Sequence, residues 1–594
     1  MKSVVMIVVR NVVKAIGHRV VGVFLLIAIG VILQACSTLS EAPVFADLVV
    51  NNGKIYTLNK QQPWAEAVAI RDGKFVFVGS NEKAMAYVGG STQVENLSGG
   101  MLMPGLIDAH VHPTTGAVKK LFECNFAFSA GPTEIYSAIE KCVGENPNAE
   151  WVRGGQWSSN FFIDHPMASP REFLDKASGG KAVVLVDDAY HNAWLSTRAL
   201  ETLGLFNTTS SIAGAELVKD KVTGLPSGLI IEAFGFLKEN LHWSREQYLQ
   251  AAEHAIKTAN QFGVTGIKGT AMSGPEIQGY QDYAEQNSPS IHMAAALMTS
   301  YGHREKVLDI EPLKKLRQQY EGTYVDANFV KIFMDGVPTV ARTAAMLAPY
   351  TSEGLGEENG ESKNYGALHV DPQILKQDII ALDNAGFTVK IHTAGDRSVR
   401  VALDAIEAAR KANGRSGLRH ELAHAGFIHD EDMPRFEALN VVADLCPYIW
   451  SPSPIIDSVI AAVGVERGAE YWPIKSLIES GAPILSGSDW PAAVATMNPW
   501  PGIESMVTRQ DPSAQYPGKL WPEQAISLEQ ALHIFTRENS LALKKAKLTG
   551  TIEVGKSADM ITLNHNLFEV PVGDISETQV LKTWFAGRVV YSAH

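Results

Sequence analysis

Short apolar segments alternate with amphipathic stretches through the middle of the chain. Helical patterns, for example at residues 371–384 and 397–411, lie between several of the apolar segments. Eight segments have the length and composition of buried strands: residues 101–108, 264–268, 292–297, 329–334, 388–392, 418–424, 441–446 and 483–488. Eight strands that alternate with helices predict an α/β fold built on a parallel (β/α)8 barrel of the TIM type.

Strand patterns of a different kind occur near both ends of the chain. Asn52-Gly53 and Asp72-Gly73 are hairpin turn signals between short alternating segments. Similar short strand-like segments occur near the other end of the chain, in GTIEVGKSADMITLN and VLKTWFAGRVVY. We therefore expect one small β-sandwich domain composed of residues 44–103 and 545–594, around a barrel of residues 104–544.

The predicted barrel region is much longer than the roughly 250 residues that a plain barrel needs. The excess lies mainly between the first two strands, at about residues 118–255. An insertion at that point would overhang the active face of the barrel. We expect it to shape the substrate pocket.

The first residues have the features of an export signal. Basic residues precede an apolar run at 20–33, which is shorter than the ~20 residues that span a bilayer. The run ends in Leu-Gln-Ala-Cys-Ser, which resembles a bacterial lipobox with Cys36 as the lipidated residue. This predicts a lipoprotein-type signal peptide at 1–36 and an exported protein attached to the periplasmic side of a membrane. The alternative is an uncleaved anchor helix.

Composition narrows the classes of partner. The 594 residues are 46% hydrophobic and 19% charged, as expected for a large folded core. A net charge of −13 disfavours nucleic acid as a partner, because phosphate binding needs clustered Lys and Arg, but it says little about the substrate. The four cysteines form no zinc-finger spacing, although Cys124 and Cys142 could pair in an oxidising compartment. Oligomeric state is not set by the sequence.

Candidate metal ligands begin at the end of the first predicted barrel strand. The motif GLIDAHVHP places His110 and His112 two residues apart. Side chains at i and i+2 of a strand point to the same face, so both imidazoles can reach one ion. The C-terminal ends of barrel strands are also where catalytic groups gather.

Four more residues occupy corresponding places at later strand ends. They are Lys331 in NFVKIFMDG, His392 in FTVKIHTAGDR, His424 in LRHELAHAGF and Asp489 in ILSGSDWP. A lysine in so apolar a strand needs a reason, because burying an unpaired ammonium is costly. A carbamate on Lys331 would supply one, as an anionic ligand that bridges two metals. The set predicts one or two divalent ions per chain, zinc or a similar metal.

Two neighbouring residues leave alternatives open. Lys390 lies two residues before His392, so its side chain is expected on the same face of the strand. It could carry the carbamate in place of Lys331, or it could contact the substrate. His420 shares parity with His424 and competes for the same ligand position.

Taken together and in order, the motifs GLIDAHVHP, VKIFMDG, HTAGDRSV, RHELAHAG, GSDWP and VGKSADMITL resemble the amidohydrolase superfamily. The resemblance is closest to its amidohydrolase-3 group, with the YtcJ-like and N-substituted formamide deformylase-like members. It implies that His110, His112 and Asp489 hold one metal, His392 and His424 hold a second, and carbamylated Lys331 bridges them. It also implies that a metal-activated hydroxide attacks a carbonyl carbon, while Asp489 passes a proton to the leaving nitrogen.

The implied activity is hydrolysis of a C–N bond other than a peptide bond in a small-molecule substrate, which would be an amide, formamide or cyclic amide. By the same resemblance, His191 in DDAYHNAWLS and Arg342 in ARTAAM are candidate substrate contacts. Alternatively, His191 caps a turn and Arg342 is a solvated loop charge, and neither contacts the substrate. The functional alternatives are a non-catalytic regulatory or binding lipoprotein with a vestigial metal site, and an ester or lactone hydrolase.

Overall fold

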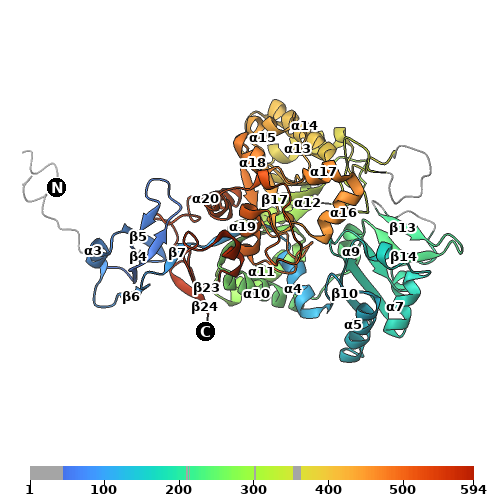
Figure 1. Cartoon of the computed structure of the whole chain (residues 1–594), viewed down its shortest axis with the longest axis horizontal. Helices are drawn as coiled ribbons and strands as arrows, with labels where there is room; N and C mark the ends of the chain where they lie inside the picture. The colour runs from blue at the N-terminus through green and yellow to red at the C-terminus, as the bar shows by residue number, and fades with distance from the viewer. Residues whose placement is uncertain are drawn as a thin grey trace, which may run out of the picture.

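The structure is a computed structural model that describes residues 45–208, 212, 215–299, 301, 303–351 and 363–593 (Figure 1). The predicted signal peptide with Cys36 lies outside these residues and stays a prediction. Across the described ranges, no helix combines the length and the apolar character that crossing a membrane requires.

A parallel eight-stranded barrel forms the centre of the molecule. Each strand pairs with the next one along the chain, and the last strand lies against the first, which brings the sheet round on itself. The strands are β8 (Leu106–Val111), β15 (Val264–Met272), β16 (His292–Met298), β17 (Val325–Phe333), β18 (Thr388–Thr393), β19 (Glu421–His424), β20 (Val442–Leu445) and β21 (Ile484–Ser486). Each of the eight predicted segments overlaps one of these strands, which confirms the predicted barrel.

Helices surround the barrel because their apolar residues recur at helical spacing. In α14 (Asp396–Asn413), for example, Val399, Leu403 and Ile406 are buried and fall on one face. The other helices of this region are α4 (Pro113–Phe122), α10 (Arg245–Gln261), α11 (Gly274–Gln286), α12 (Glu311–Gln319), α13 (Pro372–Asn384), α15 (Met433–Leu439), α16 (Pro454–Val463), α17 (Val465–Ala469), α18 (Ile474–Glu479), α19 (Pro499–Thr508), α20 (Leu528–His533) and α21 (Asn539–Ala542).

The two chain ends together build a second, smaller β domain. One sheet has the order β5-β4-β1-β6 and the other has the order β24-β23-β22-β7-β2-β3. A shared core with Val50, Phe75, Leu102, Met560 and Trp584 joins them as a sandwich. The strands are β1 (Leu48–Asn51), β2 (Lys54–Tyr56), β3 (Trp64–Ala65), β4 (Ala67–Arg71), β5 (Lys74–Gly79), β6 (Gln93–Asn96), β7 (Met101–Pro104), β22 (Met560–Leu563), β23 (Val580–Phe585) and β24 (Arg588–Ser592).

The insertion between β8 and β15 contains a mixed sheet of its own, with the order β13-β14-β12-β11-β10-β9. Figure 1 shows it on the opposite side of the barrel from the β-sandwich. A disulfide between Cys124 and Cys142 ties its edge strand to a covering helix. Its elements are β9 (Cys124–Asn125), α5 (Pro132–Glu145), β10 (Trp151–Trp157), α6 (Phe161–Asp164), α7 (Pro170–Ser178), β11 (Ala182–Asp187), β12 (Ala193–Leu195), α8 (Thr197–Thr202), β13 (Glu216–Lys219), β14 (Pro226–Ile231) and α9 (Phe234–Asn240).

Gly105 divides what the sequence pattern presents as one strand at 101–108. Residues before it belong to β7 of the sandwich, and residues after it belong to β8 of the barrel. A Cβ atom at Gly105 would lie 2.3 Å from Oγ1 of buried Thr265. The crossing between the two domains is therefore too tight for a side chain.

We expect Gly105→Ala to lower the free energy of unfolding by about 1–3 kcal/mol, because the methyl group overpacks the contact with Thr265. Urea unfolding followed by fluorescence would measure the change. Gly90→Ala is the matched control, since a Cβ there meets nothing within 4 Å. Equal effects of the two substitutions would contradict this explanation.

Candidate metal centre

The predicted metal ligands converge at the C-terminal end of the barrel. His112, Lys331, His392, His424 and Asp489 line one cavity of about 100 Å³. His110 lies beside it, with its Nε2 atom 3.3 Å from Asp489 Oδ1, and His112 Nε2 is also 3.3 Å from that oxygen. Asp489 Oδ2 lies 3.9 Å from His424 Nδ1. All six side chains therefore gather around one small space.

Backbone geometry aims two of these side chains into the cavity. His424 has a φ angle of +71° and Asp489 has one of +59°, a region that non-glycine residues seldom occupy. Regular strand alternation would turn His424 to the outside together with His420. His420 does face outward, where its Nε2 atom lies 3.0 Å from Asp383 Oδ1 of α13. The two histidines thus do not share a face, and only His424 reaches the cavity.

Asp444 is a part of the site that the sequence interpretation missed. Its Oδ2 atom accepts a hydrogen bond of 2.6 Å from His110 Nδ1, and both side chains are fully buried. This bond places the proton on Nδ1 and leaves the Nε2 lone pair for an ion, as carboxylate–histidine pairs do at metal sites. The available signal was an acidic residue in the middle of the apolar segment VVADLCP.

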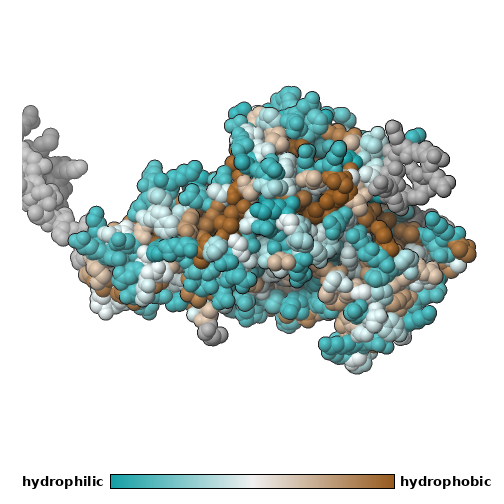
Figure 2. All heavy atoms as spheres, viewed as in Figure 1, coloured by the Kyte–Doolittle hydropathy of each residue, from teal (hydrophilic) through white to brown (hydrophobic). Residues whose placement is uncertain are grey.

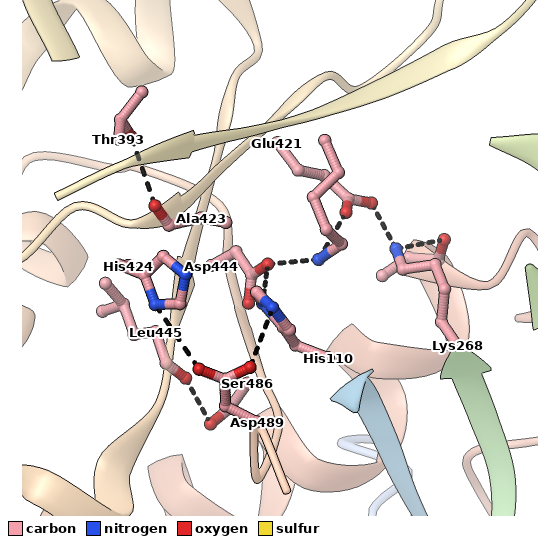
Figure 3. Close-up of polar contacts among 12 residues, drawn as sticks. His110, Lys268, Thr393, Glu421, Ala423, His424, Asp444, Leu445, Ser486 and Asp489 are labelled. Atoms are coloured by element: carbon pink, nitrogen blue, oxygen red, sulfur yellow. Dashed lines mark hydrogen bonds and ion pairs between the residues drawn. The ribbon is translucent and has the colours of Figure 1, made fainter. Parts of the chain in front are cut away.

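Asp444 also ends a chain of buried charges that crosses the barrel (Figure 3). Lys390 bonds both Asp444 and Glu421, and Lys268 bonds the other side of Glu421. Burial alone would lower the pKa of Lys390, but Asp444 and Glu421 raise it above its ordinary value. Lys390 is therefore held as an ammonium ion.

Lys331 has a different environment. Burial and the neighbouring charge of Lys390 lower its pKa to about 8. Its ammonium makes no ion pair with any carboxylate in the described part of the chain. Of the two lysines, Lys331 alone lines the cavity and approaches the neutral form in which an amine reacts with CO2.

The donor set fits a divalent cation. His110 Nε2 and Asp489 Oδ1 are buried, yet neither has a hydrogen-bond partner among the described residues. Ligand atoms of His110, His424 and Asp489 all lie within 4.8 Å of one another. Burial lowers the pKa of the three imidazoles at 110, 392 and 424, so they are neutral and offer lone pairs. Imidazole nitrogen and carboxylate oxygen are ligands that zinc and similar metals accept.

The two predicted substrate contacts lie in different surroundings. His191 lines the cavity, and its Nδ1 atom is 2.7 Å from Glu232 Oε2. Tyr301 and Thr343 donate further hydrogen bonds to Glu232, another buried carboxylate that the sequence interpretation missed. Arg342 is buried in the loop after β17 but does not line this cavity. Its contact with substrate stays a prediction.

Comparison with known sequences gives this centre a family context. The profile described as "Amidohydrolase family" matches residues 93–591, which is most of the chain. The chain belongs to the amidohydrolase family. This confirms the resemblance drawn from the motifs. It also supports the prediction that the protein is a hydrolase.

Three relatives match nearly the full length of this amidohydrolase. Protein LONG AFTER FAR-RED 3 of Arabidopsis thaliana is 29% identical over 567 residues, covering 93% of this chain and 92% of the relative. Putative amidohydrolase YtcJ of Bacillus subtilis is 26% identical, with 91% and 98% coverage. N-substituted formamide deformylase of Arthrobacter pascens is 23% identical, with 92% and 98% coverage.

A solved structure supports the fold. The crystal structure of an uncharacterized metal-dependent hydrolase from Pyrococcus horikoshii OT3 has a TM-score of 0.69 to this amidohydrolase at 22% identity. The match covers 89% of this chain and 99% of that one.

We expect Lys390→Met to lower the free energy of unfolding by about 3–5 kcal/mol, because it leaves Asp444 and Glu421 buried without their shared cation. Chemical denaturation would measure the loss. Lys411→Met should change stability little, since the Lys411 side chain is 75% exposed and exposed ion pairs contribute little. A similar small effect at Lys390 would contradict the proposed importance of the buried charges.

Proposed function

We propose that this amidohydrolase hydrolyses a non-peptide C–N bond in an amide, a formamide or a cyclic amide. The observation that carries the proposal is the pair of orphaned, buried ligand atoms His110 Nε2 and Asp489 Oδ1, which face each other at 3.3 Å. A vestigial site has no reason to keep such costly unpaired groups together with four further ligand-type side chains. The relative named N-substituted formamide deformylase supports the choice of a C–N bond.

The residues would divide between two metal positions. His110, His112 and Asp489 would hold one ion, His392 and His424 would hold the other, and a carbamate on Lys331 would bridge them. Bound there, a divalent ion would polarise a substrate carbonyl and lower the pKa of water.

Asp489 is positioned to move a proton. Burial favours its protonated form, but the adjacent His110 and His112 lower its pKa below the ordinary carboxyl value. It is therefore a carboxylate at neutral pH and can accept a proton from the attacking water. A nitrogen leaves readily only after it is protonated, so Asp489 would then deliver that proton to the leaving nitrogen.

His191 would orient the substrate from the part of the cavity wall next to His392. Its ring lies 5.4 Å, centroid to centroid, from that of His392. Burial alone would lower the pKa of His191, but the Glu232 carboxylate raises it. A ring fixed in this way offers its Nε2 edge to a polar group of the substrate.

We expect Asp489→Asn to reduce kcat/KM for an N-acyl substrate by about 10²–10⁴-fold, because the amide cannot carry the proton. Elemental analysis of the same samples would show whether metal is retained. Asp430→Asn is the matched control, since Asp430 is exposed on a nearby loop. Wild-type protein that folds without metal and hydrolyses no amide would favour the regulatory or binding alternative. Turnover of esters or lactones without turnover of any amide would favour the ester or lactone hydrolase.

We expect Lys331 to form a carbamate by reaction of its neutral amine with CO2, with release of one proton. Because its pKa is about 8, the amine is mostly protonated at pH 7 and mostly neutral at pH 9, so at equal concentrations of dissolved CO2 the carbamate forms faster at the higher pH. Carbon-13 NMR after addition of labelled bicarbonate would detect the carbamate carbon. Lys331→Ala should remove the signal and Lys411→Ala should keep it. A signal that persists in Lys331→Ala would assign the carbamate elsewhere.

A further inference from the structure

A second cavity lies where the insertion meets the barrel. It has a volume of about 120 Å³ and is lined by residues of α4, β10, β11, α9, α10 and α11, together with the loops beside them. None of the six predicted metal ligands lines it. A cavity of ~150 Å³ holds a benzene ring, so this cavity has room for a ligand of about five or six heavy atoms.

The walls of this cavity carry two acidic and two basic side chains. Lys238 and Glu276 pair with each other, with Lys238 Nζ 2.7 Å from Glu276 Oε1. The other two, Glu123 and Arg153, form no ion pair with each other or with any other described residue. They are nevertheless close together. Burial raises the pKa of Glu123 and lowers that of Arg153, and the charge of each group opposes the shift of the other.

The Arg153 guanidinium is held in place by its neighbours in the chain. Its Cζ atom lies 4.6 Å from the centroid of the Trp243 ring, and its Nη1 atom donates a hydrogen bond of 3.1 Å to the carbonyl oxygen of His242. A guanidinium has five N–H donors, so most of them remain for a ligand. The natural partner for such a group is a carboxylate, which can accept two parallel hydrogen bonds from it.

Glu123 supplies the opposite charge from a fixed position. It follows α4 directly and precedes Cys124, whose disulfide with Cys142 holds the chain at this point. Its carboxylate accepts no hydrogen bond from a described residue. Burial raises its pKa to about 7, although Lys119 and Arg153 act in the opposite direction. An ammonium group inside the cavity would supply the missing partner of this carboxylate.

Tyr190 adds an unpartnered hydroxyl to the same wall. The hydroxyl is buried and has no hydrogen-bond partner among the described residues. Burial raises its pKa well above the ordinary value, and the charges of Glu123 and Asp187 add to this effect. Because a buried polar group without a partner costs free energy, this wall still lacks a hydrogen-bonding group that a ligand could supply.

We propose that this cavity binds a small zwitterionic amino acid, with the ligand carboxylate on Arg153 and the ligand ammonium on Glu123. One positive and one negative charge compensate both side chains, whereas a simple anion or cation would leave one of them unpaired. The volume limits the ligand to about the size of glycine or alanine. The site does not depend on the proposed function, since it uses none of the predicted metal ligands.

Calorimetric titration of the metal-loaded protein at pH 8, where Glu123 is mostly ionised, tests the class of ligand. We expect glycine and alanine to bind about 10–100-fold more tightly than acetate or methylammonium, because only the amino acids engage both charges. The same order is expected in Asp489→Asn, in which the metal centre is altered. Absence of glycine binding, or binding no tighter than that of acetate or methylammonium, would overturn the proposal.

Substitutions in the cavity wall test the position of the site. We expect Glu123→Gln and Arg153→Met each to weaken glycine binding about 10–100-fold. Glu140→Gln and Arg198→Met are the matched controls, because both side chains are exposed elsewhere on the insertion and do not line the cavity. Figure 2 shows mainly hydrophilic residues around α5, the helix that carries Glu140. Unchanged binding in both wall variants would overturn the proposal, and binding lost only in Asp489→Asn would place glycine at the metal centre instead.

Discussion

The hydrogen bond between Asp444 and His110 connects the buried charges inside the barrel to the predicted metal site. Four buried charged side chains, two acidic and two basic, cross the barrel interior, and the last of them fixes the tautomer and orientation of a predicted metal ligand. Because charges of this kind are tolerated inside a protein only when they are balanced, the metal site and the stability of the barrel depend on the same contacts. The site is therefore a continuation of the core rather than an addition to its surface.

The insertion turns this barrel end into a bounded space. It supplies His191 and, in Phe126, Phe128 and Phe161, three of the aromatic residues that line a neighbouring cleft of about 810 Å³, while the strand ends supply the predicted ligands. Its disulfide holds Cys124 next to the loop at 125–130, which forms one side of the cleft. The predicted ligands and the wall of the cleft thus come from different parts of the chain, so the residues of the cleft wall can change without a change in the ligands.

The sequence predicts the barrel and the ligand set because both leave local signals, namely apolar segments and polar residues at their ends. It cannot predict Glu232, whose role depends on contacts with His191 and Tyr301 from other elements. Nor can strand alternation predict that His424 turns inward and His420 outward, because an unusual backbone angle decides it. The choice between Lys331 and Lys390 depends likewise on which lysine meets carboxylates after folding.

The composite sandwich has a consequence for how the protein is made. β7 lies near the start of the chain, and its neighbour β22 lies near the end, where the two strands pair in antiparallel fashion. β7 is therefore synthesised long before β22, and their sheet cannot be complete until β22 has been made. Closing such a long loop carries an entropic cost and slows folding. Until β22 is made, β7 lacks this neighbour, and its unpaired edge is of the kind that can pair with another chain.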